Sequence, residues 1–439
     1  MSVDLLTAGA TPQRRDQLVW RNHVLFDYRA GDDGVELTAT GGADLTTLTA
    51  RSGQTGYFSR TSSGLYVGRG GLIGSAFANF PTLNYNLENS VPGLLLQAAR
   101  TNLVTSSDIS AWTDSGTPTV SAVTGPGSAL TGYTISDDDA GASELKLRTV
   151  AYTGDAAKAV AIAVKYVSSA QSAIVVRDTT AGANRLYATI TWVGTSPGTP
   201  AMTTGTYLGK FQLANDWWIL LFQTSSVTAA NTNQMWLYGT DATAAQTGAT
   251  SYAAPSTWDA TVPGMLQTAS LAQTADVLYF DYKAAPQAKT TYSRFIERGS
   301  LLVSGSTLWH FGLTNGTTDP RLRVTSNGSV YVLGHDNGSA DVASTLGAGP
   351  AVGAVVEHRS ELFADGSVRI HQSLDEAAET SASASGANAL GSTWGGAAAA
   401  RLYLNSDPAG ANTGLIELQA IGDVPGTDHT MAALRRRFG

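Results

Sequence analysis

The sequence predicts an all-β protein: tandem antiparallel β-sandwiches (jelly rolls), preceded by an irregular β-rich N-terminal domain and followed by a short C-terminal helix. Three observations support this fold class. Charged residues are only 14% of the chain, against ~25% in typical soluble domains. Glycine is frequent, with 47 in 439 residues. Finally, turn formers separate short runs of β-branched and aromatic residues, a pattern that favours antiparallel sandwiches over βαβ units.

The first predicted domain covers residues 1–104. Strand candidates at 24–28 and 35–38 flank the turn Gly31-Asp-Asp-Gly34. An alternating, turn-rich stretch follows from Tyr57 to Tyr85. We therefore expect short strands and irregular loops here, with little helix.

The second predicted domain covers residues 105–286. Its strand candidates are rich in Val, Ile, Trp and Tyr and are bounded by clusters of Gly, Ser, Asn and Pro. They lie at 159–167, 173–177, 186–193, 217–222 and 234–238. This pattern predicts an antiparallel sandwich.

The third predicted domain covers residues 287–439 and carries four dipeptides that favour hairpin turns. They are Asn315-Gly316, Asn327-Gly328, Asn337-Gly338 and Asp365-Gly366. Because short strand candidates lie between the first three, the sequence predicts a meander. At the C-terminus, Asp428 is a suitable N-cap for the expected short helix over 428–434.

Several segments carry a family resemblance. The stretch from Gly93 to Trp112, with Ala-Arg-Thr-Asn-Leu at 99–103, resembles a joint found in bacteriophage tail-fibre and virion-surface proteins, where it precedes a carbohydrate-binding-module-like sandwich. Segments at 57–73, 215–219 and 275–280 also resemble parts of those proteins. The strand series of the third domain, ending in 416–421, is similar to a laminin-G/concanavalin-A-like jelly roll.

The resemblance implies a non-catalytic virion structural protein: a fibre, spike or surface decoration. In this interpretation residues 1–104 attach to the capsid or tail, and the sandwiches display surfaces that adhere to host glycans. Expected partners are other virion proteins, host-surface glycans and further copies of the chain in a homo-oligomer. The expected location is the virion surface, after synthesis in the bacterial host cytoplasm without a signal peptide. Two alternatives stay open, a ligand-free capsid or tail cement protein and a polysaccharide depolymerase.

Composition argues against several other functions. The net charge is −8 and no basic stripe with interleaved aromatics is present, so nucleic-acid binding is not expected. Cysteine is absent, which excludes disulfides and thiolate metal sites within the sequence. No apolar run approaches the ~18 residues of a membrane-spanning helix, so membrane insertion is not expected.

One strand candidate carries titratable residues that invite a hydrolase interpretation. Glu357 and Glu361 share a strand face with His358 between them, but four residues along a strand separate them by roughly 13 Å. Retaining glycosidases need carboxylates about 5 Å apart. We therefore expect solvated strand or edge residues here, and no enzyme.

A cofactor is not expected, although calcium is an open alternative. Asp336, Asn337 and Asp341 could supply oxygen ligands, and concanavalin-like domains often carry calcium. Their spacing does not follow an EF-hand, and solvated turn residues are the competing interpretation.

Aromatic side chains are the candidates for carbohydrate binding, because a sugar ring stacks its C–H face on Trp or Tyr. In the strand at 234–238, period-two alternation places Trp236 and Tyr238 on the face opposite Met235 and Leu237. If the aliphatic face fills the core, the aromatic face is available to a ligand; burial of both faces is the alternative. Trp192 and Trp258 are further candidates. By contrast, Trp112, Trp217 and Trp218 match the structural tryptophans of the resembled sandwich.

Overall fold

The structure is a computed structural model. It describes residues 24–27, 36–39, 46–49, 55–68, 70–76, 78, 83–86, 91–97, 99–242, 246–260, 266–273, 277–281, 289–296, 307–312, 321–326, 330–336, 341–346, 349–351, 353–363, 365, 367–385, 401–404 and 415–422. The chain divides into two compact units. Unit 1 comprises Met1–Phe58, Val277–Glu297 and Ser304–Gly439, and unit 2 comprises Ser59–Asp276 and Arg298–Val303.

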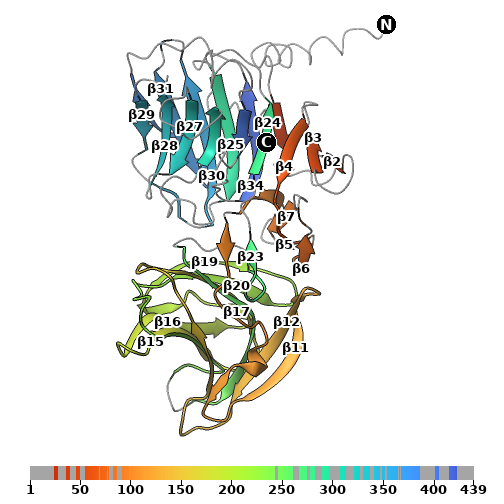
Figure 1. Cartoon of the computed structure of the whole chain (residues 1–439), viewed down its shortest axis with the longest axis vertical. Coiled ribbons are helices and arrows are strands. Elements are labelled where there is room, and N and C mark those ends of the chain that lie inside the picture. The colour runs from red at the N-terminus through yellow and green to blue at the C-terminus, as the bar shows by residue number, and fades with distance from the viewer. Residues whose placement is uncertain are drawn as a thin grey trace. The chain divides into compact units, whose positions relative to one another are not determined.

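Unit 2 contains two antiparallel sheets (Figure 1). The first sheet has the order β10 (Thr113–Ser115), β13 (Leu145–Val150), β21 (Asn233–Tyr238), β15 (Gln171–Asp178), β16 (Ala183–Val193) and β17 (Ser196–Pro197), and β18 (Ala201–Thr204) also pairs with β16. The second has the order β11 (Thr119–Gly127), β12 (Leu130–Asp137), β22 (Gly248–Trp258), β14 (Ala159–Tyr166), β20 (Trp217–Gln223) and β19 (Thr206–Gln212). Both sheets lie within the predicted range 105–286.

A shared apolar core joins the two sheets of unit 2. Alternate residues of each strand contribute to it because strand side chains point to opposite faces in turn. From the first sheet come, among others, Ile174, Val176, Leu186, Ala188, Met235 and Leu237; from the second come Val160, Ile162, Val164, Leu220, Phe222 and Tyr252. Contact between two such rows makes the unit a sandwich.

The tryptophans expected in the core are largely there. Trp112 and Trp217 are buried, and half-buried Trp218 packs against the core. Gly132 on β12 makes room for Trp217, because a Cβ at this position would lie 2.7 Å from the indole ring. A side chain at residue 132 would therefore have to displace Trp217.

The joint at the start of the sandwich is fixed by Asn102. Its amide nitrogen donates to the carbonyl oxygens of Pro255 and Gln267, both at 3.2 Å. Its amide oxygen accepts from the backbone N–H groups of Val104 and Thr257, both at 3.1 Å. Both ends of this buried side chain are therefore satisfied, and they tie the joint to β22 and to the segment that follows β22.

Short elements complete the described part of unit 2. They are the hairpins β5 (Gly64–Val67) with β6 (Ile73–Ala76) and β7 (Leu83–Asn86) with β8 (Val91–Leu95), the pair β9 (Arg100–Thr101) with β23 (Ala272–Gln273), and the 3-10 helix η2 (Ile109–Ala111). Asp108 caps η2 by accepting from the N–H of Ser110 at 3.0 Å.

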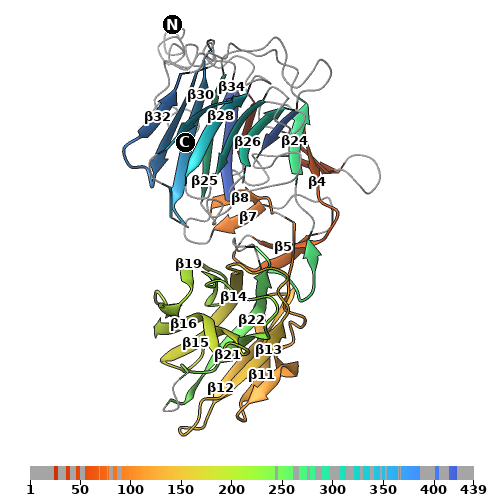
Figure 2. The ribbon, with the colours of Figure 1, turned by 60° about the vertical axis from the view of Figure 1, so that its left-hand side comes forward.

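Unit 1 is also built from antiparallel strands (Figure 2). One sheet contains β32 (Thr380–Ala384), β31 (Val368–Leu374), β30 (Val355–Leu362), β25 (Lys289–Ile296) and β34 (Leu415–Gly422) in that order, and β1 (Val24–Asp27) also pairs with β34. The other has the order β2 (Glu36–Ala39), β3 (Thr46–Thr49), β4 (Thr55–Ser59), β24 (Val277–Asp281), β33 (Arg401–Leu404), β26 (Thr307–Gly312), β27 (Arg321–Ser326), β28 (Tyr331–Asp336) and β29 (Asp341–Thr345).

The predicted fold class is confirmed, since the described residues form antiparallel sheets and no α-helix. The meander is confirmed as well, because β26 to β29 pair in sequence. The described strands of residues 1–104 fall in both units: β1 pairs with β34 in unit 1, and β5 pairs with β6 in unit 2.

Two further predictions concern helices. The expected C-terminal helix over 428–434 lies outside the described residues. Within the described part of the chain, no helical segment has the length and apolar character needed to cross a bilayer.

Candidate functional site

The outward face of the first sheet of unit 2 carries the predicted aromatic pair. Met235 and Leu237 point into the sandwich core and are fully buried. Trp236 and Tyr238 therefore lie on the opposite face, as the period-two alternation predicts. Their ring centroids are 6.5 Å apart, with 57° between the ring planes.

Neighbouring strands add an apolar floor around this pair. Leu147 of β13 and Val175 of β15 stand opposite Trp236 on either side, and Tyr187 of β16 stands opposite Val175. The buried part of the floor is Leu145, Ala173, Val175 and Tyr238, and Leu147, Tyr187, Trp236 and Ala242 pack against it. We call Tyr187, Trp236 and Tyr238, with this floor, the aromatic face.

Polar side chains hold the tryptophan in place. The indole N–H of Trp236 donates to Gln234 Oε1 at 2.9 Å. The guanidinium of Arg177 lies over the Trp236 ring, 5.2 Å from its centroid, and Arg177 Nη1 donates to Asn184 Oδ1 at 3.0 Å. The ring is half-buried, so its orientation is fixed while part of it stays accessible.

The two tyrosines keep their phenolic protons at neutral pH. Burial raises the pKa of Tyr238 to about 12. Burial, and to a smaller extent the negative charge of Asp241, raises the pKa of Tyr187. Asp241 Oδ2 itself accepts from Gln246 Nε2 at 3.2 Å. The site thus combines planar rings with hydroxyl, amide, guanidinium and carboxylate groups, a set suited to binding a polyol and its ring faces.

The other two predicted aromatic candidates lie elsewhere. Trp192 is buried against the sandwich core, 5.7 Å from the ring of Tyr166, and its N–H donates to Ser172 Oγ at 3.2 Å. Trp258 is fully buried, and its N–H donates to Gln267 Oε1 at 2.6 Å. Neither ring offers an open face to a ligand, because both fill packing positions.

The titratable residues of β30 are buried, and the expectation of solvated strand or edge residues is wrong. Glu357, His358 and Glu361 are each at most 1% exposed. His358 points to the face that contacts Tyr331, with the two rings 4.6 Å apart. Glu357 and Glu361 share the other face, where Tyr292 donates to Glu357 Oε1 at 2.7 Å.

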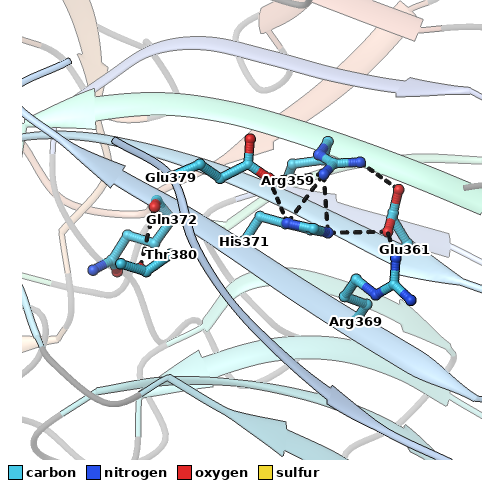
Figure 3. A network of polar contacts seen from close by, with 7 residues as sticks. All are labelled: Arg359, Glu361, Arg369, His371, Gln372, Glu379 and Thr380. Atoms are coloured by element: carbon cyan, nitrogen blue, oxygen red, sulfur yellow. Dashed lines mark hydrogen bonds and ion pairs between the residues drawn. The ribbon is translucent and has the colours of Figure 1, made fainter. Parts of the chain in front are cut away.

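Around Glu361, charged side chains of β30, of β31 and of the residue before β32 form ion pairs with one another (Figure 3). We call them the charge network: Arg359, Glu361, Arg369, His371 and Glu379. Arg359 contacts both glutamates, with Nη2 at 2.8 Å from Glu379 Oε1. His371 also contacts both, with Nε2 at 3.0 Å from Glu361 Oε2.

The carboxylates of this network are held in ion pairs. Glu361 and Glu379 are both engaged by Arg359 and His371 (Figure 3). Glu357, on the same face as Glu361, is four residues away along β30, roughly 13 Å at the strand rise. That separation exceeds what either a retaining or an inverting carboxylate pair uses.

The calcium candidates are placed only in part. Asp336 and Asp341 are register partners at the end of the β28–β29 hairpin, and Asn337 lies outside the described residues. Among the residues that the structure describes, no group of three or more His, Cys, Asp or Glu side chains could hold a metal ion. Calcium binding remains a prediction.

Sequence reasoning missed Arg177 and Tyr187. Both share the outward face with Trp236, and alternation alone places Arg177 and Val175 on one face of β15. The pairing of β15 with β21 and β16 was needed to bring these residues together. For Arg359 and His371 the available signal was the recurrence of charged residues along the two consecutive strands β30 and β31.

No protein-family model matches the sequence, and no curated protein matches it. Among solved structures, the LG1-3 region of the laminin alpha2 chain is 10% identical, with a TM-score of 0.26 over 64% of this chain and 63% of that one. The mouse laminin alpha1 chain, domains LG4-5, is 11% identical, with a TM-score of 0.24 over 72% of this chain and 99% of that one.

A third similar structure is a bifunctional GH43-CE protein from Bacteroides eggerthii. It is 10% identical, with a TM-score of 0.21 over 88% of this chain and 53% of that one. TM-scores of this size do not establish a shared fold. The chain is therefore classed by its own sheets, as an all-β protein with an antiparallel sandwich in unit 2.

Proposed function

We propose that the chain is a non-catalytic adhesion protein that binds glycans through the aromatic face of unit 2. The observation that carries the proposal is the outward orientation of Trp236 beside Tyr187 on a sheet whose inward face already fills the core. The two half-buried rings of Trp236 and Tyr187, together with polar groups, match what a saccharide needs. The engagement of the β30 carboxylates by basic partners supports a non-catalytic function.

We further propose that the protein is displayed on a bacteriophage particle, as a homo-oligomer that contacts other virion proteins. The ordered resemblance of the segment from Gly93 to Trp112 and its neighbours to virion-surface proteins supports this. Cryo-electron microscopy of purified particles tests it, with density for the chain on head or tail as the expected result. Absence of the chain from purified particles would contradict it.

A glycan array with the full chain tests the binding proposal. We expect Trp236→Ala to reduce glycan binding by about 30-fold or more, as loss of an aromatic anchor costs about 2 kcal/mol or more. Phe211→Ala is the matched control, since Phe211 is a half-buried aromatic residue on β19 of the other sheet. Equal binding by both variants, or no binding by the unaltered chain, would refute glycan recognition at this face.

A further inference from the structure

Arg177 belongs to the cations of the described sandwich that bond to neutral groups, with Arg148 and Lys210, whereas three other cations are paired with carboxylates. Lys146 pairs with Asp114, Lys158 with Asp259 and Arg185 with Asp178, at N–O distances of 2.5, 2.7 and 2.7 Å. In the part of the chain that the structure describes, no carboxylate forms such a pair with Arg177. Its hydrogen-bond partner there is the neutral amide of Asn184.

The guanidinium of Arg177 is nevertheless held in place. Trp236 lies under it at 5.2 Å, and the bond from Nη1 to Asn184 fixes its rotation. Trp236 is held in turn by Gln234. Arg177 is half-buried, so its remaining N–H donors are presented from a defined position at the aromatic face.

A fixed guanidinium without a counter-charge recognises planar anions. Its fork of parallel N–H groups matches the two oxygens of a carboxylate, and these charge-assisted bonds are about twice as strong as neutral ones. Beside it, the half-buried rings of Trp236 and Tyr187 supply the surface on which a pyranose packs. The ligand that satisfies both features is a sugar with a carboxylate on its ring.

We infer that the aromatic face binds acidic saccharides, with Arg177 receiving the carboxylate of a hexuronic acid and the neighbouring rings receiving the sugar. This inference rests on the proposed glycan binding and narrows the ligand to acidic saccharides. Trp236 then has a second task, because it positions Arg177 as well as contacting the sugar.

The test uses the full chain and a panel of bacterial exopolysaccharides that contain hexuronic acid. Each is immobilised beside its carboxyl-reduced form, in which the carboxylate has become a CH₂OH group. We expect carboxyl reduction to weaken binding about 10- to 100-fold, the equivalent of one charged hydrogen bond or pair of bonds. This arm involves no mutation, so protein misfolding cannot produce the result.

Variants locate the effect. Arg177→Gln should lower affinity for the acidic form by the same factor and leave the reduced form unaffected. Arg148→Gln is the matched control: Arg148 is half-buried on β13 of the same sheet and donates to Thr105 Oγ1. Its substitution should leave binding unchanged.

The outcomes separate the two proposals. Equal binding of acidic and reduced forms, with loss of both in Trp236→Ala, would overturn the acidic-saccharide inference and leave glycan binding intact. Binding to dextran sulfate but to no uronate polymer would also overturn it, in favour of sulfate recognition. If no glycan of any kind binds, both proposals fail.

Discussion

Two sheet faces, one in each unit, are stabilised by different kinds of interaction. The aromatic face of unit 2 is built from rings and aliphatic side chains, with Arg177 over Trp236. The β30–β31 face of unit 1 is built from Arg359, Glu361 and His371, none more than 6% exposed. The first face is held together by apolar contact and by the polar groups that orient Trp236. The second depends on every charge having its partner, because an unpaired buried charge is costly.

The largest expected effect is in the charge network. Glu361→Ala leaves Arg359 and His371 buried without one of their two carboxylates, and we expect unit 1 to lose about 3–5 kcal/mol of stability. Hydrogen exchange of β30 and β31 peptides in the intact chain measures this, with unit 2 peptides as an internal reference. Thr380→Ala is the control, since its exposed hydroxyl makes only a 3.3 Å bond to the Gln372 carbonyl (Figure 3). Equal losses of stability in Glu361→Ala and Thr380→Ala would show that the ion pairs of the network stabilise unit 1 no more than this single hydrogen bond does.

In unit 2 the buried polar side chain comparable with Glu361 is that of Asn102. Asn102→Ala leaves the buried N–H groups of Val104 and Thr257 without the acceptor they share. At about 1–2 kcal/mol for each of the two orphaned groups, in the lower part of the usual range, we expect a loss of about 2–4 kcal/mol, confined to unit 2 peptides in the same experiment. Asn102→Asp should lose at least as much, because a carboxylate oxygen would replace the donor to the carbonyl oxygens of Pro255 and Gln267 and would bury an unpaired charge there. Unchanged exchange in both variants would contradict this account.

Acid should affect the two units in different pH ranges. Burial lowers the pKa of His358 in unit 1 to about 4, below the ~6.5 of an exposed histidine. The unfolded chain therefore binds more protons than the folded chain between these values. Stability contributed by neutral His358 is complete above pH 6.5 and falls by about 3 kcal/mol as the pH drops towards 4.

In unit 2 the hydrogen bond from Arg185 lowers the pKa of Asp178 to about 2, so the stability it contributes is lost only as the pH falls from about 4 towards 2. Hydrogen exchange at pH 7, 5 and 4, corrected for intrinsic rates, distinguishes the units. His358→Gln should remove much of the pH dependence of unit 1. An unchanged pH profile in that variant would assign the effect to other groups.

The smallest expected effect lies at the rim of the charge network. Arg369 is 43% exposed in its side chain, and its Nη1 is 3.9 Å from Glu361 Oε2. Exposed pairs contribute about 0–1 kcal/mol, so Arg369→Ala should reduce the stability of unit 1 by less than about 1 kcal/mol in urea denaturation. A loss of stability close to that of Glu361→Ala would mean that the exposed Arg369 contributes as much to the charge network as its buried members do.

Sequence reasoning reached the aromatic pair but only part of its surroundings. The orientation of Trp236 followed from alternation, which is a local property of one strand. Strand β22, in contrast, was not predicted, because Gly248–Trp258 is rich in Ser, Thr and Ala and contains Pro255. It is nevertheless a central strand, between β12 and β14. Its place is set by partners more than 80 residues away, which local propensity does not report.

The burial of Glu357 and Glu361 was missed for a related reason. Charged side chains are rarely buried unless they are paired, so an isolated strand with two glutamates is expected to face water. The partners that make burial possible come from other segments: Tyr292 from β25, and His371 and Glu379 from 10 to 18 residues further along the chain. Register between strands decides such pairing, and periodicity within one strand does not contain it.

The position of Asn102 also has a consequence for synthesis. Its acceptors at Pro255 and Gln267 lie 153 and 165 residues later in the chain. During synthesis, Asn102 therefore cannot form these hydrogen bonds until almost the whole domain has left the ribosome. Contacts this distant in sequence form slowly, and they leave strand edges open in the meantime. Closure of the joint by Asn102 would thus mark the moment at which the nascent sandwich stops being vulnerable to pairing with other chains.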